Sequence, residues 1–583
     1  MALFSRVNSN VFSLLSHCYY KKYTMGTGRL RLRGRTSMLL NVQYKSSTRS
    51  NFTGVQTTLE TEIIQRRDQA RRSLLIQVYS PKSHNDLYNY CSRFGDILSM
   101  HHYQVNRNHY QENYILVEFK DVVSVDEIMS YASFVRSDYI APVKSSVLWF
   151  RKGQVAISQK YQTKVALTVE HGYIYVNDKK ILNVLSNAKS ISGQIIILYE
   201  TLRLTDLEIR LRFHTAQHLE QYFSGLFHNM RVLPFGSSIN GFGRRKCDLD
   251  LVLVPNYSQE GNSRLVFHSK PIRHNDRTET KEFLGVLANA MYQFIPGISN
   301  VRRILEARVP IIKFHYDYTQ IECDLSATNM TAVYMSELLN LYGEMDWRVR
   351  PLVTAIRVWA KRQEITTDVP GQWITNFPLT LLVLFYLQQK EILPSLKILK
   401  LHAARGDVRC TENGIDCTFL RDINKLPADF KYKLNQDSLE TLLHDFFEYY
   451  STFNFDIYGI CIREGRQIQK PSHTALHITN PLETTLNVGK NVSFYELNRI
   501  ISKAQDAVHT LETADKTNED NWGIMTLLKI NNVNTKNLKK LNNTKESETI
   551  KNYLENRSYE ISDKFDVSEE NTNEPKAKKE EIV

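Results

Sequence analysis

The sequence lacks the features of several protein classes. It has seven cysteines in 583 residues, and no two of them have Cys-x-x-Cys spacing, so neither a disulfide framework nor a zinc ribbon is indicated. The longest apolar run, Leu379–Leu387, is far shorter than the roughly 20 residues that a membrane span requires. We therefore expect reduced thiols, a buried helix around Leu379–Leu387 and no membrane span.

Acidic residues are absent from the first 59 positions, which contain nine lysines and arginines. Subtracting these nine from the net charge of +12 leaves +3 for the rest of the chain, so RNA binding would depend on local basic patches. Residues 1–50 are rich in Arg, Ser and Thr and begin with apolar residues such as Phe4, Val7 and Phe12. This composition is typical of a mitochondrial transit peptide, which predicts location in the mitochondrial matrix. The alternative is a basic disordered arm that binds nucleic acid.

Two short segments predict a cluster of polar groups at the ends of strands. Gly236 and Ser237 form a small-residue loop whose backbone amides can approach a phosphate closely. Asp248 and Asp250 follow at the start of an apolar strand and share one face of it, because residues i and i+2 of a strand point the same way. Asp324 lies in a second alternating segment, 320–326, and is the candidate for a third carboxylate; 309–314 is its expected hairpin partner.

Adjacent carboxylates repel each other, and a bound divalent cation removes that cost. Mg²⁺ prefers carboxylate and phosphate oxygens, and two ions held by three carboxylates can stabilise both the attacking and the leaving oxygen of a displacement. An isolated Asp-x-Asp is more often a solvated strand edge. Its combination with the glycine-serine loop favours a site for metal and triphosphate.

Ordered motifs extend this pattern over about half of the chain. They are Phe235–Ser237, Asp248–Asp250, Cys323–Ser326, Asn329, Arg357–Lys361, Ile374–Leu379 and Asn480–Thr484. In these motifs the chain resembles the template-independent poly(A)/poly(U) polymerase family, which has the nucleotidyltransferase fold shared with DNA polymerase beta. The resemblance implies an α+β fold with a nucleotidyltransferase palm of mixed sheet and helices at 201–335. A helical central, PAP-associated domain is implied at 336–510.

The resemblance also implies an activity. The enzyme would transfer a nucleoside monophosphate from a triphosphate to an RNA 3′-hydroxyl and release pyrophosphate, with Mg²⁺ or Mn²⁺ held by Asp248, Asp250 and Asp324. By position in the motifs, the nucleotide contacts would be Phe235, Gly236 and Ser237 (triphosphate), Asn329 and Ser336 (ribose), Lys361 (phosphates), and Asn376 and Phe377 (base).

The choice of base rests on one position. Leu486 stands where uridine-adding members carry a histidine, and an apolar residue cannot donate to uracil, which favours ATP as the substrate. An RNA uridylyltransferase is the alternative enzyme. A catalytically inactive RNA-binding scaffold is the alternative of a different class, but retention of all three carboxylates argues against it.

The regions around the motifs are less informative. Residues 60–150 predict a β-α-β-β-α-β order similar to an RNA-recognition motif, with Tyr114 as one suitable aromatic and Leu116 where a second is expected. We expect this domain to form a homodimer, as the resemblance implies, with direct RNA binding as the alternative. Residues 151–200 are interpreted as connecting strands and 515–583 as a disordered tail. His214 and His218 are expected in the core, because no further zinc ligands lie nearby.

Overall fold

The computed structural model describes residues 58–107, 110–133, 144–151, 165–169, 178–227, 230–255, 277–367, 371–411, 413–427, 435–513 and 522–528. The predicted transit peptide lies outside this part of the chain. Among the described residues, no helix combines the length and the apolar character needed to cross a membrane. The six cysteines that the structure describes are free thiols.

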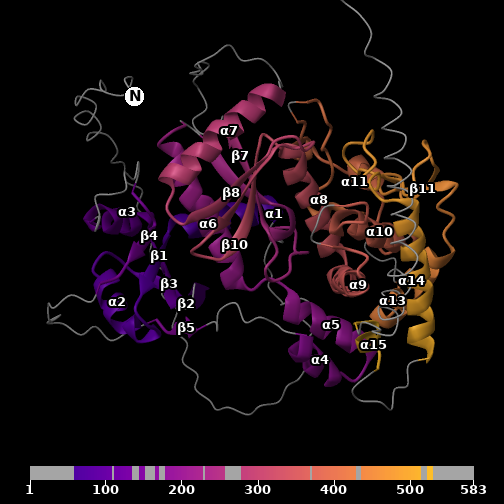
Figure 1. Cartoon of the computed structure of the whole chain (residues 1–583), viewed down its shortest axis with the longest axis horizontal. Helices are drawn as coiled ribbons and strands as arrows, with labels where there is room; N and C mark the ends of the chain where they lie inside the picture. The colour runs from indigo at the N-terminus through magenta and orange to yellow at the C-terminus, as the bar shows by residue number, and fades with distance from the viewer. Residues whose placement is uncertain are drawn as a thin grey trace, which may run out of the picture. The chain divides into compact units, whose positions relative to one another are not determined.

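The N-terminal region is a five-stranded sheet with two helices on one face (Figure 1). The strand order is β4-β1-β3-β2-β5, and helix α1 precedes the sheet. The bounds are α1 (Leu59–Arg71), β1 (Ser73–Val78), α2 (His84–Cys91), β2 (Ile97–Arg107), β3 (Tyr110–Phe119), α3 (Val122–Tyr131), β4 (Val147–Trp149) and β5 (Leu167–Val169). The predicted β-α-β-β-α-β order is confirmed by β1 through β4, and β5 extends the sheet beside β2.

The second face of this sheet is buried against the palm. Tyr114 is 1% exposed, and its ring stacks on that of Tyr103 with centroids 5.5 Å apart. The Tyr103 hydroxyl donates to the backbone oxygen of Tyr318 at 2.8 Å, and Leu207 and Leu211 complete the cluster. RNA-recognition motifs stack bases on this face. Palm side chains cover it here, so the structure contradicts direct RNA binding through Tyr114.

The palm is a mixed sheet in the order β6-β7-β10-β9-β8. Its elements are α6 (Asp206–Ser224), β6 (Met230–Phe235), β7 (Leu249–Pro255), α7 (Arg277–Phe294), β8 (Ile298–Ile304), β9 (Ile311–Tyr316) and β10 (Ile321–Ala327). Helices α6 and α7 pack on the face that carries Leu251, Leu325 and Phe314 (Figure 1). The residues that alternate with these lie on the opposite face. Strands β9 and β10 pair antiparallel, which confirms the predicted hairpin.

Helix α6 begins with a capping box in which Thr205 and Glu208 satisfy each other's backbone amides. His214 and His218 on this helix are fully buried, and burial lowers their pKa to about 4 and about 3. His218 is hydrogen bonded to the Tyr316 hydroxyl at 2.7 Å and to Ser145 Oγ at 3.1 Å. The predicted core role is confirmed for this pair.

The interpretation of 151–200 as connecting strands is wrong for its second half. Residues 178–202 form α4 (Asp178–Ser186) and α5 (Ile191–Leu202). Ser190 begins α5 by accepting a hydrogen bond from the Gly193 amide at 3.0 Å. The isoleucine-rich run of α5 packs into the core of the central domain. A short apolar run rich in β-branched residues is compatible with a strand and with a buried helix. In this protein, packing against the central core selects the helix.

The central domain is helical with one small sheet. It comprises α8 (Met330–Met345), α9 (Val349–Arg362), α10 (Asn376–Gln389), α11 (Leu396–Leu401), α13 (Leu439–Thr452), β11 (Tyr458–Cys461), β12 (Arg466–Gln469), β13 (Ile478–Thr479), α14 (Phe494–Thr513) and α15 (Ile524–Leu528). The predicted buried helix is confirmed by α10. With the two mixed sheets, this domain confirms the α+β class.

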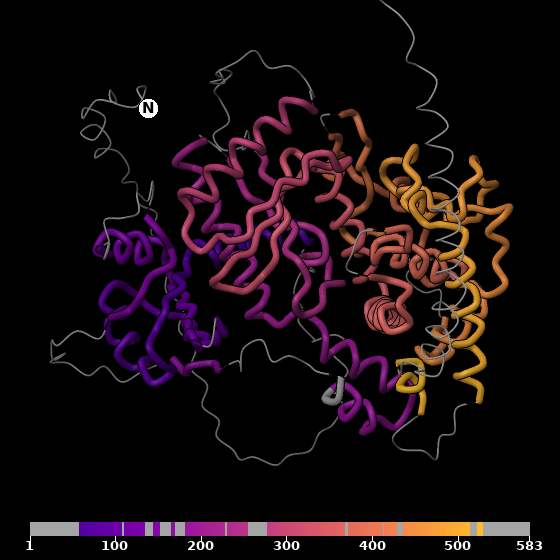
Figure 2. The backbone as a smooth tube through the Cα atoms, in the orientation of Figure 1, coloured from indigo at the N-terminus to yellow at the C-terminus, as the bar shows by residue number. Residues whose placement is uncertain are grey.

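The prediction of disorder at 515–583 is wrong for the residues of α15. Ile524, Met525, Leu527 and Leu528 are buried in the core of the central domain. Figure 2 shows this yellow C-terminal helix beside the purple helices α4 and α5, with which it is in contact. Gln194 of α5 holds it in place, donating to the Trp522 backbone oxygen at 3.3 Å and accepting from the Ile524 amide at 2.9 Å.

Candidate active site

Three carboxylates lie together on the open face of the palm sheet. Asp250 of β7 is directly opposite Asp324 in the parallel pairing of β7 with β10, and Asp248 immediately precedes β7. Lys313 of β9 is opposite Asp324 on the other side. Its Nζ lies 3.1 Å from Asp248 Oδ2 and 3.1 Å from Asp324 Oδ1. The structure therefore brings together the three predicted carboxylates and adds a lysine.

Burial and repulsion from neighbouring carboxylates disfavour the charged forms of Asp250 and Asp324. Burial, followed by the charges of Asp324 and Asp248, raises the pKa of Asp250 to about 7. Burial also raises the pKa of Asp324, although Lys313 opposes that change. A site with more negative than positive charge, built of hard oxygen ligands, fits a divalent cation. Asp248, Asp250 and Asp324 are the residues that would hold it.

We expect Mn²⁺ binding without nucleotide to weaken as the pH falls below 7. The pKa of Asp250 is raised to about 7, so below that pH a proton must leave before the cation binds. Displacing one proton raises the dissociation constant about tenfold per pH unit. Calorimetric titration of Mn²⁺ between about pH 5 and pH 9 would measure this slope, whereas a constant dissociation constant would contradict it.

The small-residue loop Gly236–Ser238, called the phosphate loop below, lies against this cluster. Gly236 has a φ of 67°, and a Cβ there would lie 2.3 Å from Asp250 Oδ2. Only glycine allows this backbone conformation and this approach. The Gly236 amide donates to Ser336 Oγ at 2.7 Å, and the Ser336 hydroxyl donates to the Ala332 backbone oxygen at 2.7 Å. Ser336 is 2% exposed and lies beneath the loop as a support, and its expected ribose contact stays a prediction.

A buried arginine that the sequence analysis did not identify fixes the other end of the loop. Arg212 of α6 is 2% exposed and donates to the backbone oxygens of Cys247 at 2.6 Å and Asp248 at 3.3 Å. It also donates to Ser238 Oγ at 3.1 Å. These bonds join the phosphate loop to the residue where the carboxylate pair begins. The available signal was a charged residue between Leu211 and Phe213 in an apolar helical stripe.

The remaining predicted nucleotide contacts lie on the central domain and its border with the palm. Asn329 immediately precedes α8, and Lys361 is half-buried in the last turn of α9. Asn376 is exposed at the start of α10, and Phe377 is half-buried against the central core. Phe235, at the end of β6, packs beside Val252 and is opposite Asp250 in the sheet.

Arg357 connects these two parts of the site. Its guanidinium donates to Thr380 Oγ1 at 3.0 Å and to the backbone oxygens of Phe242 at 2.9 Å and Asn376 at 3.4 Å. Burial lowers its pKa to about 10, which leaves it charged near neutral pH. The arginine of the Arg357–Lys361 motif therefore fixes the start of α10 relative to the segment that follows the phosphate loop.

The segment Asn480–Val492, which the resemblance places near the base, has a fixed shape. Asn480 Oδ1 accepts from the amides of Leu482 and Glu483, both at 3.0 Å. Glu483 forms an ion pair with Arg308, which lies in the turn between β8 and β9. Leu486 is half-buried in this segment. The pair joins the segment to the palm hairpin that carries Lys313.

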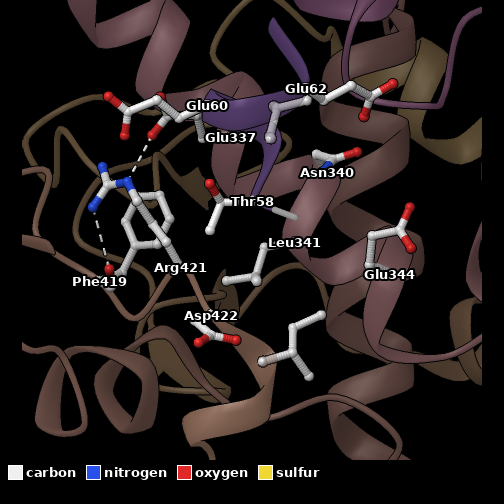
Figure 3. A pocket seen from close by; sticks show the side chains of 12 residues that line it. Thr58, Glu60, Glu62, Glu337, Asn340, Leu341, Glu344, Phe419, Arg421 and Asp422 are labelled. Carbon is white, nitrogen blue, oxygen red and sulfur yellow. Dashed lines mark hydrogen bonds and ion pairs between the residues drawn. The ribbon is translucent and has the colours of Figure 1, made fainter. Parts of the chain in front are cut away.

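Two cavities lie away from the carboxylates. One, of about 290 Å³, is lined by Glu60 and Glu62 of α1, Glu337 and Glu344 of α8, Phe419 and Arg421–Ile423, and none of the predicted site residues lines it (Figure 3). Two of the lining residues, Arg421 and Glu337, form an ion pair at 2.9 Å. The second, of about 220 Å³, reaches Ser237 and Ser238 but not the aspartates. Neither cavity contains the carboxylate cluster.

Comparisons with known proteins agree with this geometry. Residues 191–344 match the family model "Poly(A) RNA polymerase, mitochondrial-like, central palm domain", and 438–489 match "Cid1 family poly A polymerase". The chain is 42% identical to the mitochondrial poly(A) RNA polymerase of Drosophila melanogaster, covering 76% of this chain and 74% of the relative. Identity with the Homo sapiens protein of the same name is 34%, covering 84% of both chains.

Solved structures give the same result. The crystal structure of mtPAP in complex with ATPgammaS has a TM-score of 0.72 at 32% identity and covers 81% of this chain and 99% of that chain. The complex of mtPAP with UTP has a TM-score of 0.72 at 31% identity, with the same coverage. The palm model begins at residue 191, so it includes α5. On sequence identity across most of both chains, this protein belongs to the mitochondrial poly(A) RNA polymerase family.

Proposed function

We propose that this protein adds adenylate to RNA 3′ ends without a template, in mitochondria. It transfers AMP from ATP to the 3′-hydroxyl and releases pyrophosphate. The observation that carries the proposal is the cluster of Asp248, Asp250 and Asp324 in contact with the Gly236 loop. The names of its relatives support both the reaction and the mitochondrial location, and the composition of residues 1–50 supports import into the matrix.

In the proposed mechanism the chain positions the reactants. The amides around Gly236 and Ser237 bind the triphosphate, and Lys361 contributes positive charge near it. Asp324 lies on the side of the cluster away from the loop, where it can accept the proton of the RNA hydroxyl. Mg²⁺ or Mn²⁺ bound at the three aspartates would neutralise charge on the phosphates and would lower the pKa of the RNA 3′-hydroxyl.

Adenine is the proposed base because Leu486 offers uracil no donor. Phe377 and Asn376, with Asn329 at the ribose, are the proposed remaining contacts. A stacking surface alone discriminates weakly between bases, since strong rejection requires hydrogen bonds to the base edge. The solved relatives include complexes with UTP, GTP and CTP as well as ATPgammaS. RNA uridylyltransferase activity is therefore the second candidate, favoured by the UTP complex of a relative.

The test uses protein without residues 1–50, a short labelled RNA, Mg²⁺ or Mn²⁺, and each ribonucleoside triphosphate in turn. We expect long extension with ATP, abolished in Asp248→Ala. Extension mainly with UTP would replace the adenine assignment by the uridylyltransferase. If the RNA is extended with none of the triphosphates, the proposed enzymatic activity is contradicted and the inactive RNA-binding scaffold is favoured.

Homodimerisation through the region 60–150 is also proposed. The face that carries Tyr114 is buried within the chain, so a partner would use the edges or the helical face of the sheet. Trp149 on β4 and Val169 on β5 are 58% and 45% exposed at the two edges. Edge strands present unpaired backbone groups that a second chain can use. Light scattering of the full chain tests this, and a monomer at micromolar concentration would contradict it.

A further inference from the structure

A row of charged side chains crosses the open face of the palm sheet. In neighbouring strands, residues directly opposite each other point to the same face. Asp250 is opposite Asp324, Asp324 is opposite Lys313, and Lys313 is opposite Arg302. The row therefore runs from the negative carboxylates in β7 and β10 to two positive side chains in β9 and β8. Strand β8 is the outer edge of the sheet.

Arg302 is exposed on this edge. Its backbone belongs to the β8–β9 pairing, but its side chain makes no hydrogen bond or ion pair with the residues that the structure describes. Arg303, the next residue, is opposite Ile312 and points to the other face, where it binds Asn289 of α7. Two adjacent arginines on one strand therefore have different surroundings. Arg302 lies in line with the carboxylates, whereas Arg303 is held against a helix.

The geometry of the reaction indicates on which side of the carboxylates the RNA lies. In an in-line displacement, the attacking and leaving oxygens lie on opposite sides of the phosphorus. The phosphate loop follows β6, beside β7, so the leaving pyrophosphate lies on that side of the carboxylates. The attacking hydroxyl must then approach from the side of β10, β9 and β8. An RNA chain that ends at Asp324 from this direction passes over Lys313 and Arg302.

We propose that Lys313 and Arg302 bind the phosphates of the last nucleotides of the RNA substrate and guide its 3′ end to Asp324. This inference rests on the proposed function, because it names the substrate path of the same site. Lys313 is close enough to the carboxylates to position Asp324 as well. The two hydrogen bonds to the carboxylates belong to Lys313, so Arg302 serves only the RNA. Guanidinium and ammonium groups bind phosphate through charge, independently of base sequence.

The experiment compares Arg302→Gln with Arg303→Gln in the full chain. Binding of a labelled single-stranded RNA is followed by fluorescence anisotropy in EDTA without ATP, over about 50 to 200 mM salt. Loss of one phosphate contact should weaken binding several-fold and reduce the slope of log K against log salt by about 0.7. Arg303→Gln makes the same change of charge on the other face, so it should match the wild type. Melting temperatures check that both variants fold.

Extension kinetics then separate the RNA path from the triphosphate site. Arg302→Gln should raise the KM for RNA several-fold while kcat and the KM for ATP stay unchanged. Lys313→Met should raise the KM for RNA and also lower kcat, because it contacts two carboxylates. The inference would be overturned if Arg302→Gln and Arg303→Gln had the same RNA affinity and the same KM for RNA. A raised KM for ATP in Arg302→Gln would also overturn it. A wild type that binds RNA through Arg302 but extends it with no triphosphate would overturn the proposed function and leave the RNA path intact.

Discussion

The variant Asp250→Asn should lose RNA extension and, without metal, melt at a higher temperature than the wild type. Asparagine cannot bind a divalent cation as a carboxylate does, and loss of an essential catalytic group costs about a thousandfold or more in rate. The gain in stability comes from the cost of the buried charge, because burial and its two aspartate neighbours raise the pKa of Asp250 to about 7.

The size of this gain in stability depends on pH. The folded state favours protonated Asp250, so the stability that this group contributes is complete below its unfolded pKa near 4 and is lost as the pH rises through 7. Asparagine stays neutral at every pH. The free energy of unfolding of Asp250→Asn should therefore exceed that of the wild type by a few kcal/mol at about pH 8, and the difference should vanish below about pH 4. Thermal melts in EDTA at both pH values measure it, with Asp506→Asn, at an exposed position of α14, as the neutral control. An Asp250→Asn protein that melts lower than the wild type at pH 8 would contradict this account.

Ending the chain at residue 521 should destabilise the central domain strongly. This truncation removes α15, whose buried side chains Ile524, Met525, Leu527 and Leu528 lie in the main core. Each buried side chain of this size contributes about 1.5–3 kcal/mol, so the total loss should exceed about 5 kcal/mol. The hydrogen bonds of Gln194 with residues 522 and 524, and of Gln363 with the Leu527 backbone oxygen, are lost with them.

The matched control ends at residue 530 and keeps α15. It removes only residues 531–583, whose composition predicts no packed core. Denaturant unfolding should show the loss of stability for the shorter chain alone. If the chain that ends at residue 521 unfolds at the same denaturant concentration as the control, the burial of α15 does not contribute to stability.

The carboxylate cluster was predictable because its geometry is local. The two-residue period of a strand places Asp248 and Asp250 together, and the alternation in 320–326 places Asp324 on an open face. Neither segment alone predicts that β7 pairs with β10, which is the step that brings Asp324 next to Asp250. The order of strands and helices in 60–150 was predictable for the same reason, since each element has its own periodicity.

The supporting residues could not be predicted because their partners are distant in sequence. Arg212 binds backbone oxygens 35 and 36 residues away, and Lys313 binds a carboxylate 65 residues away. The buried face of Tyr114 depends on Tyr318 and α6 of the palm. Helix α5 was misread because an Ile-rich run fits strand and helix alike, and α15 because five residues in a polar tail form no period of their own.

The contact between α5 and α15 has a consequence for how the protein is made. Gln194 and its hydrogen-bond partners at 522 and 524 are separated by about 330 residues. A ribosome synthesises the chain from its N-terminus, so α5 emerges long before the helix that covers it. Until then the part of α5 around Ile191 and Gln194 lacks its cover, although α9 and α13, which also pack against α5, emerge earlier. Chaperones that hold exposed apolar segments are thus expected to engage the nascent chain at α5 and to leave only when the last helix has arrived.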